Sequence, residues 1–76
     1  MEEIDVRGLS CPQPVLTVLK EIKAIEKGRV IVRVDNETAK ENVIRAIESQ
    51  GWQVKVVKPE GRDWEIIIEK DQNGTI

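Results

Sequence analysis

Apolar and polar residues follow two different periods along the chain, and these periods predict its elements. An alternation of two, which gathers apolar side chains on one face of a strand, occurs four times. A spacing of three and four, which makes one apolar stripe along a helix, occurs twice. The patterns predict strands over residues 3–7, 29–34, 52–57 and 63–70, and helices over residues 12–27 and 38–50.

Turn and cap residues mark where the predicted elements begin and end. Pro12 and Pro14 suit the first turn of a helix, because the amides there have no acceptor within the helix. Thr38, with Glu41 three residues later, matches a capping box at the start of the second helix. The stretch "KPEGR", residues 58–62, is typical of a turn, so the last two strands are expected to form a hairpin.

The order of the elements, β-α-β-α-β-β, predicts an α+β fold. Each helix joins two strands over a span that suits a right-handed parallel crossover, so both helices should pack on one face of the sheet. We therefore expect a two-layer sandwich with a four-stranded mixed sheet and one uncovered face. A single domain over residues 1–70 and a polar tail over residues 71–76 are expected.

The burial of several side chains follows from the same alternation. Trp64 shares a face with the apolar residues of its strand and is expected in the core. Trp52 stands at a strand start, where partial exposure is expected. Ile31, Val57 and Ile67 are expected on the uncovered face, where an apolar patch would favour docking or dimerisation.

Composition narrows the classes of function. The chain has 76 residues, a net charge of -2, one cysteine and no histidine. The charge argues against nucleic-acid binding, which favours a basic face. One cysteine without histidine excludes an internal disulfide, a Cys-His metal site and a Ser-His-Asp triad within the chain, so no metal or cofactor is expected. A lone thiol and the absence of a signal or membrane-spanning pattern favour a cytoplasmic protein.

Cys11 stands in "RGLSCPQP", between the turn at Gly8 and the start of the first predicted helix. The N–H groups and partial positive charge of a helix N-terminus lower the pKa of a nearby thiol. No acidic residue occurs between Asp5 and Glu21, whereas Arg7 lies in that interval. A reactive thiolate is one interpretation, and a buried cysteine that acts as a small hydrophobic residue is the other. Because the chain has no resolving cysteine, a reactive thiol would exchange with another molecule.

The stretch "DVRGLSCPQP", residues 5–14, resembles the signature of the TusA/SirA-like family of small sulfur-carrier proteins, whose hallmark is Cys-Pro-x-Pro after the first strand. Residues 34–54 are similar to the N-terminal domain of the YedF-type branch. The resemblance covers nearly the whole chain. It also implies that the last strand inserts beside the second.

The resemblance implies a mechanism in which Cys11 accepts sulfane sulfur as a persulfide. The donor would be a cysteine desulfurase or another sulfurtransferase, and the sulfur would pass to a downstream sulfur or selenium acceptor protein. Such a chain acts as a carrier with partner enzymes, not as a stand-alone catalyst. In the family these pathways lead to tRNA thiolation, molybdenum-cofactor biosynthesis or sulfur oxidation, and selenium metabolism is associated with the YedF branch. Gly8, Pro12 and Pro14 carry over as the rigid setting of the cysteine.

YedF-type proteins usually carry a second, C-terminal domain, whereas this sequence ends at Ile76. A stand-alone carrier and a separated domain are both consistent with that difference.

Three further residues are candidates near this site. Arg7 could steer an anionic persulfide or an acidic partner, although such an arginine often only solvates a strand end. Asp35 and Asn36 should lie on the neighbouring loop, where they could hydrogen-bond a partner protein. Both are also common turn and cap residues.

Two other functions are compatible with the sequence. In one, the Cys-Pro-x-Pro turn is structural and the chain is a binding or regulatory module for RNA or protein. The acidic charge and the presence of only two aromatic residues count against RNA. In the other, the chain is a redox sensor that forms a mixed disulfide through Cys11.

Overall fold

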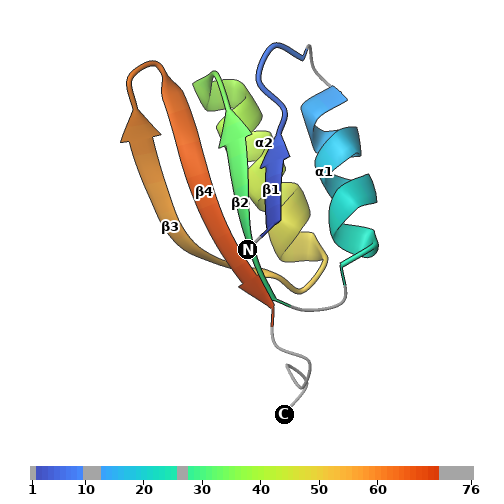
Figure 1. Ribbon diagram of the computed structural model, residues 1–76. Helices are drawn as coiled ribbons and strands as arrows, with labels where there is room; N and C mark the ends of the chain where they lie inside the picture. The colour runs from blue at the N-terminus through green and yellow to red at the C-terminus, as the bar shows by residue number, and fades with distance from the viewer. Residues whose placement is uncertain (1, 10–12, 26–27, 71–76) are drawn as a thin grey trace.

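The computed structural model describes residues 2–9, 13–25 and 28–70, which form six elements (Figure 1). Cys11 and Pro12 lie outside the described residues, as does the predicted tail. The elements are β1 (Glu2–Asp5), α1 (Gln13–Lys23), β2 (Gly28–Val34), α2 (Glu37–Ser49), β3 (Gln53–Glu60) and β4 (Asp63–Lys70). The predicted order and the α+β class are confirmed.

The four strands form one mixed sheet in the order β1-β2-β4-β3. β1 and β2 are parallel, whereas β4 pairs antiparallel with both β2 and β3. The last strand therefore lies beside the second, as the family resemblance implied. Because β1 and β2 are parallel and each is followed by a helix, the N-termini of α1 and α2 lie at the same edge of the sheet (Figure 1).

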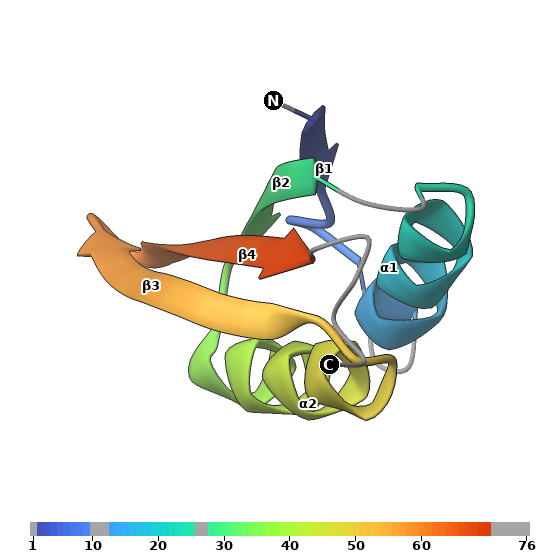
Figure 2. The ribbon, with the colours of Figure 1, turned by 90° about the horizontal axis from the view of Figure 1, so that it is seen from below.

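Both helices pack on one face of the sheet, and the core lies between the two layers (Figure 2). β2 and β4 occupy the centre of the sheet and contribute five side chains that are fully buried. Each buried valine or isoleucine side chain stabilises the fold by roughly 1.5–3 kcal/mol relative to an exposed one. The buried apolar residues are Ile4, Val6, Val18, Ile22, Val30, Val32, Val34, Ala39, Val43, Ile47, Trp52, Ile66 and Ile68.

The two tryptophans both belong to the helix-covered side of the sheet. Trp64 is partly buried and packs against the core, as predicted, with the Lys40 ammonium 4.0 Å from the centre of its ring. The expectation that Trp52 is partly exposed is wrong, because only 3% of this residue is accessible. The chain turns at Gly51 (φ 86°) directly after α2, and the Trp52 N–H donates to the carbonyl of Ile47 at 3.3 Å. This turn places the indole in the core.

The uncovered face of the sheet carries Ile31, Ile67 and Val56, which pair across β2, β4 and β3. Ile31 and Ile67 are half-buried there, as predicted. The expectation for Val57 is wrong, because a register shift between Val54 and Val56 reverses the alternation in β3. Val57 consequently pairs with Ile66 of the helix-covered face, and Val56, which is 44% exposed, takes the uncovered position.

Ion pairs surround these apolar residues on the uncovered face. Arg33 of β2 contacts Glu3 of β1, Glu60 of β3 and Glu65 of β4, the last at 2.9 Å. The hydrogen bond to the Glu3 carboxylate is the main reason why the pKa of Arg33 is raised. One arginine thus joins all four strands.

The ends of the elements differ from the prediction by a few residues. β3 continues to Glu60, and the turn is reduced to Gly61 (φ 65°) and Arg62. Pro59 is tolerated within β3 because this is an edge strand, where a missing N–H need not break a ladder. α1 ends at Lys23, earlier than expected. None of the helices among the described residues is long and apolar enough to cross a membrane.

Candidate functional site

The cysteine segment, residues 9–13, follows the loop after β1. One hydrogen bond connects this loop to the loop after β2. The Gly8 N–H donates to Oδ2 of Asp35 at 2.7 Å, which joins the loop after β1 to the loop after β2. Gly8 has φ 82°, a backbone conformation that residues with a Cβ rarely adopt. The predicted turn at Gly8 therefore has a definite conformation and a definite partner three residues before the cysteine.

Asp35 is in turn held by Asn36, which caps α2. The Asn36 side-chain amide donates to Oδ1 of Asp35 at 2.9 Å, and its Oδ1 accepts the Ala39 N–H at 2.7 Å. The N–H of Gly8, followed by the amide of Asn36, favours the ionised carboxylate and lowers the pKa of Asp35. The loop after β1 is thereby connected through two side chains to the N-terminus of α2.

The predicted capping box is wrong. Asn36 has extended backbone geometry (φ -159°, ψ 161°) and occupies the N-cap, whereas Thr38 is already inside the helix and exposed. Asparagine caps a helix as well as serine or threonine does, because its short side chain reaches the same free amides. With the first helical residue at Glu37, Glu41 cannot complete the box that was expected.

Arg7 is held at the same edge of the sheet by two carboxylates. Its Nε and Nη2 donate to Asp5 at 2.9 and 2.7 Å, and its Nη1 donates to Asp63 at 3.1 Å. These bonds join the end of β1 to the start of β4. The side-chain hydrogen bond from Arg7 lowers the pKa of Asp5 to about 2. The Arg7 side chain is 44% exposed, and a role in steering a partner remains a prediction.

Pro14 anchors the other end of the cysteine segment. It is buried at the second residue of α1, and the first turn of that helix contains no acidic residue. Lys20 and Lys23 lie in the last turn, so charged side chains complement the dipole of α1 at its C-terminal end. The cysteine segment therefore lies in the sequence between two anchored residues. Gly8 is hydrogen-bonded to Asp35, and Pro14 is buried in α1.

A small, mostly apolar pocket lies beside this segment. Leu9, which is 37% exposed, Pro14 and Val15 form one side of it, and the first turns of α2 form the other. Sequence reasoning missed this pocket. The available signal was Leu9, an apolar residue in a predicted turn where the alternation gave it no buried partner.

The fold also brings carboxylates to this edge that are remote in the sequence. Asp5, Asp35 and Asp63 surround Arg7 and Gly8 along an open depression. The sequence between Asp5 and Glu21 lacks acidic residues. In the fold, however, Asp35 from the loop after β2 contacts Gly8, and Asp63 from β4 contacts Arg7. In the part of the chain that the structure describes, these carboxylates form no cluster able to hold a metal ion.

The family model described as sulfurtransferase TusA matches residues 2–70. The chain belongs to the TusA sulfurtransferase family. This match includes the "RGLSCPQP" stretch, and it confirms the family suggested by that motif.

Three curated relatives from archaea match almost the whole chain. Two proteins of Archaeoglobus fulgidus assigned as sulfur carriers are 30% and 31% identical over 71 residues, which are 92% and 91% of this chain and 97% and 81% of theirs. A protein of Methanocaldococcus jannaschii with the same assignment is 32% identical over 71 residues, 92% of this chain and 95% of its own.

A solved structure supports the fold independently. The crystal structure of a SirA-like protein from Desulfitobacterium hafniense superposes with a TM-score of 0.79 and 30% identity. The similarity covers 91% of this chain and 96% of that one.

Proposed function

We propose that this TusA family member is a sulfur carrier in which Cys11 receives sulfane sulfur as a persulfide and passes it to a partner protein. The observation that carries the proposal is the frame around the cysteine segment, which is fixed on one side by the Gly8–Asp35 hydrogen bond and on the other by buried Pro14. Cys11 stands between these two points, two residues before the first residue of α1. Its relatives assigned as sulfur carriers support the same function.

The transfer needs no external oxidant or reductant. The Cys11 thiolate attacks the outer sulfur of a donor persulfide, the S–S bond of the donor breaks, and the donor thiolate leaves with the electron pair of that bond. The outer sulfur and its proton now reside on Cys11. An acceptor thiolate then attacks the same outer sulfur, and the Cys11 thiolate leaves.

The surroundings of Cys11 favour this exchange in two ways. The N-terminus of α1 supplies free N–H groups and partial positive charge, which stabilise a thiolate relative to a thiol. Pro12 and Pro14 restrict the backbone on the helix side, so the sulfur would be presented with little loss of conformational freedom on docking. Arg7, Asp35 and Asn36 lie at the same edge, where a donor or acceptor protein would contact them.

A cysteine desulfurase or another sulfurtransferase is the proposed donor, and a sulfur or selenium acceptor protein is the proposed recipient. The acceptor determines whether the pathway leads to tRNA thiolation, cofactor biosynthesis or selenium metabolism. A cytoplasmic location, where such donors work and a single thiol stays reduced, is part of the same proposal.

The test is the intact-protein mass after incubation with a cysteine desulfurase, pyridoxal phosphate and L-cysteine. We expect a gain of one sulfur atom that a thiol reductant removes and that Cys11→Ser does not show. A second sample uses a rhodanese-type sulfurtransferase with thiosulfate as the donor. If neither donor adds sulfur while Cys11 reacts readily with iodoacetamide, the thiol is reactive but the carrier proposal is wrong. If Cys11 resists both, the cysteine is structural.

A further inference from the structure

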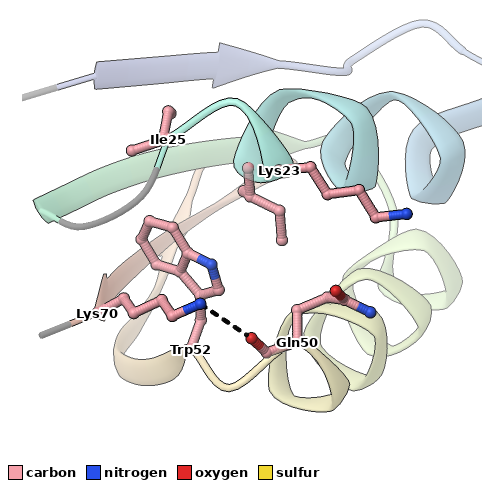
Figure 3. Close-up of a pocket in the computed structure, with 6 residues that line it drawn as sticks. Lys23, Ile25, Gln50, Trp52 and Lys70 are labelled. Carbon is pink, nitrogen blue, oxygen red and sulfur yellow. Dashed lines mark hydrogen bonds between the residues drawn. The ribbon is translucent and has the colours of Figure 1, made fainter. Parts of the chain in front are cut away.

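A second pocket, of about 290 Å³, lies at the ends of α1 and α2 opposite to their N-termini, and Figure 3 shows the residues that line it. The C-terminal ends of α1 and α2, the start of β3 and the end of β4 surround it. The lining residues are Ile22, Lys23, Ile25, Gln50, Trp52 and Lys70. No sequence pattern predicted this site, because its residues come from four separate parts of the fold.

The floor of this pocket is apolar. Ile22 and Trp52 are 2% and 3% accessible and belong to the core, and half-buried Ile25 packs against that core. The accessible apolar surface of the floor therefore comes mainly from Ile25, and each Å² of it that a ligand removes from water contributes roughly 25 cal/mol.

The polar groups of the pocket are mainly hydrogen-bond donors. Figure 3 shows the nitrogen edge of the Trp52 indole directed toward the space between Lys23 and Gln50. This indole N–H has no acceptor among the described residues. Lys23 comes from α1 and Lys70 from β4, and neither forms an ion pair with a carboxylate in residues 2–9, 13–25 or 28–70. Among the described residues, the hydrogen-bond partner of Lys70 is the Gln50 carbonyl, at a long distance of 3.4 Å.

Each of the two helix C-termini that face this pocket carries roughly half a negative charge, whereas Lys23 and Lys70 each carry a full positive charge. Several of the terminal carbonyl groups also accept hydrogen bonds from within the chain. At the end of α1, the N–H groups of Ala24 and Ile25 donate to Glu21 and Ile22, both at 3.1 Å. At the end of α2, the N–H groups of residues 50–52 donate to the carbonyls of Ile47 and Glu48 at 3.1–3.3 Å.

We propose that this pocket binds a small aliphatic carboxylate. The aliphatic body would lie on the floor of Ile22, Ile25 and Trp52, and the carboxylate would accept hydrogen bonds from the indole N–H and from a lysine ammonium. A charge-assisted bond of this kind is stronger than a neutral one. The volume lies near the lower end of the range for small-ligand sites, which suits a body of several methylene groups. The site shares no residue with the cysteine segment, so the inference goes beyond the sulfur-carrier function.

The test uses octanoate as the probe, with octanol and acetate as matched controls for its body and its charge. Binding is followed in the wild-type chain by the NMR signal of the Trp52 indole N–H, which Trp64→Phe identifies by leaving a single indole signal. We expect saturable shifts with octanoate and affinities at least about tenfold weaker for octanol, which cannot form the charge-assisted bond, and for acetate, which lacks the aliphatic body.

Lysine variants test which ammonium group binds the carboxylate of octanoate. Lys70→Gln and Lys23→Gln should each weaken octanoate binding without changing octanol binding, and exposed Lys58 on β3 gives the matched control Lys58→Gln, which should bind octanoate normally. Equal affinities for octanoate and octanol, or unchanged octanoate binding in both pocket variants, would overturn the proposal. Lys70→Gln should still accept sulfur on Cys11, so failure here is separate from failure of the carrier function.

Discussion

Asp35 accepts the Gly8 N–H at 2.7 Å, and this bond spans 27 positions of the sequence. It connects the start of the cysteine segment to the loop that caps α2. If Cys11 must meet a partner's sulfur in a defined geometry, then Asp35 is a positioning residue for the transfer, because it fixes the loop from which the segment begins.

Removal of the Asp35 carboxylate should slow sulfur uptake. We expect Asp35→Ala to lower the rate of persulfide formation by about threefold to tenfold, the equivalent of one hydrogen bond. Asp35→Asn retains an acceptor oxygen for the Gly8 N–H and should recover most of the rate. The measurement is single-turnover sulfur uptake by mass. An equal loss in the two variants would show that the charge of Asp35, and not its hydrogen bond, is what the donor protein recognises.

The N-cap of α2 can be tested by mutation, because the structure places it at Asn36 whereas the sequence pattern predicted Thr38. Asn36→Ala should lower the free energy of unfolding by about 1 kcal/mol, because the Ala39 N–H loses its acceptor. Thr38→Ala, the change that the predicted capping box would make costly, should have little effect. Both are compared with wild type by urea unfolding. A larger loss for Thr38→Ala would place the cap at Thr38.

The Arg7–Asp5 pair predicts an acid-dependent stability. The pKa of Asp5 is about 2 in the folded chain, against 3.8 for an unperturbed aspartate, so the stabilisation is fully present above pH 4 and is lost as the pH falls toward 2. Arg7→Gln removes the main cause of the lowered pKa. The difference in unfolding free energy between wild type and Arg7→Gln should be largest near neutral pH and shrink toward pH 2.

The control for this pH profile is Arg62→Gln. Arg62 is exposed in the turn between β3 and β4 and makes no ion pair with another described residue. Its substitution should leave the profile unchanged between pH 4 and 2. A pH-independent difference for Arg7→Gln would mean that the pair contributes no linkage and that Arg7 stabilises the edge by packing alone.

Adjacent residues of β4 should respond very differently to truncation. Ile66 is fully buried under the helices, so Ile66→Ala should cost about 2–5 kcal/mol through lost burial and a cavity. Ile67 is half-buried on the uncovered face, and Ile67→Ala should cost clearly less. Thermal and urea unfolding measure both. Because a chain of this size has little stability to lose, Ile66→Val, at about 0.5–1.5 kcal/mol, is the fallback if Ile66→Ala does not fold.

The sequence by itself determined the kind and order of the six elements and the place of Pro14, the last residue of the Cys-Pro-x-Pro motif, in the first turn of α1. Periodicity is a local property: an alternation such as that of Val30, Val32 and Val34 needs only the neighbouring residues to define a buried face. The same locality explains why Pro14 could be assigned to a first helical turn before the fold was known.

Only the tertiary structure decided which distant groups meet. The Gly8–Asp35 bond and the Arg7–Asp63 contact depend on strand order, which no local pattern encodes. The bulge in β3 exchanged the faces of Val56 and Val57, because one extra residue reverses a period of two. Trp52 became a core residue, and the floor of a pocket, through a turn at Gly51 that brings it beneath two helix ends. Hydrogen bonds and packing between remote segments depend on the topology of the whole chain. For that reason the contacts around the cysteine segment could be read only from the tertiary structure.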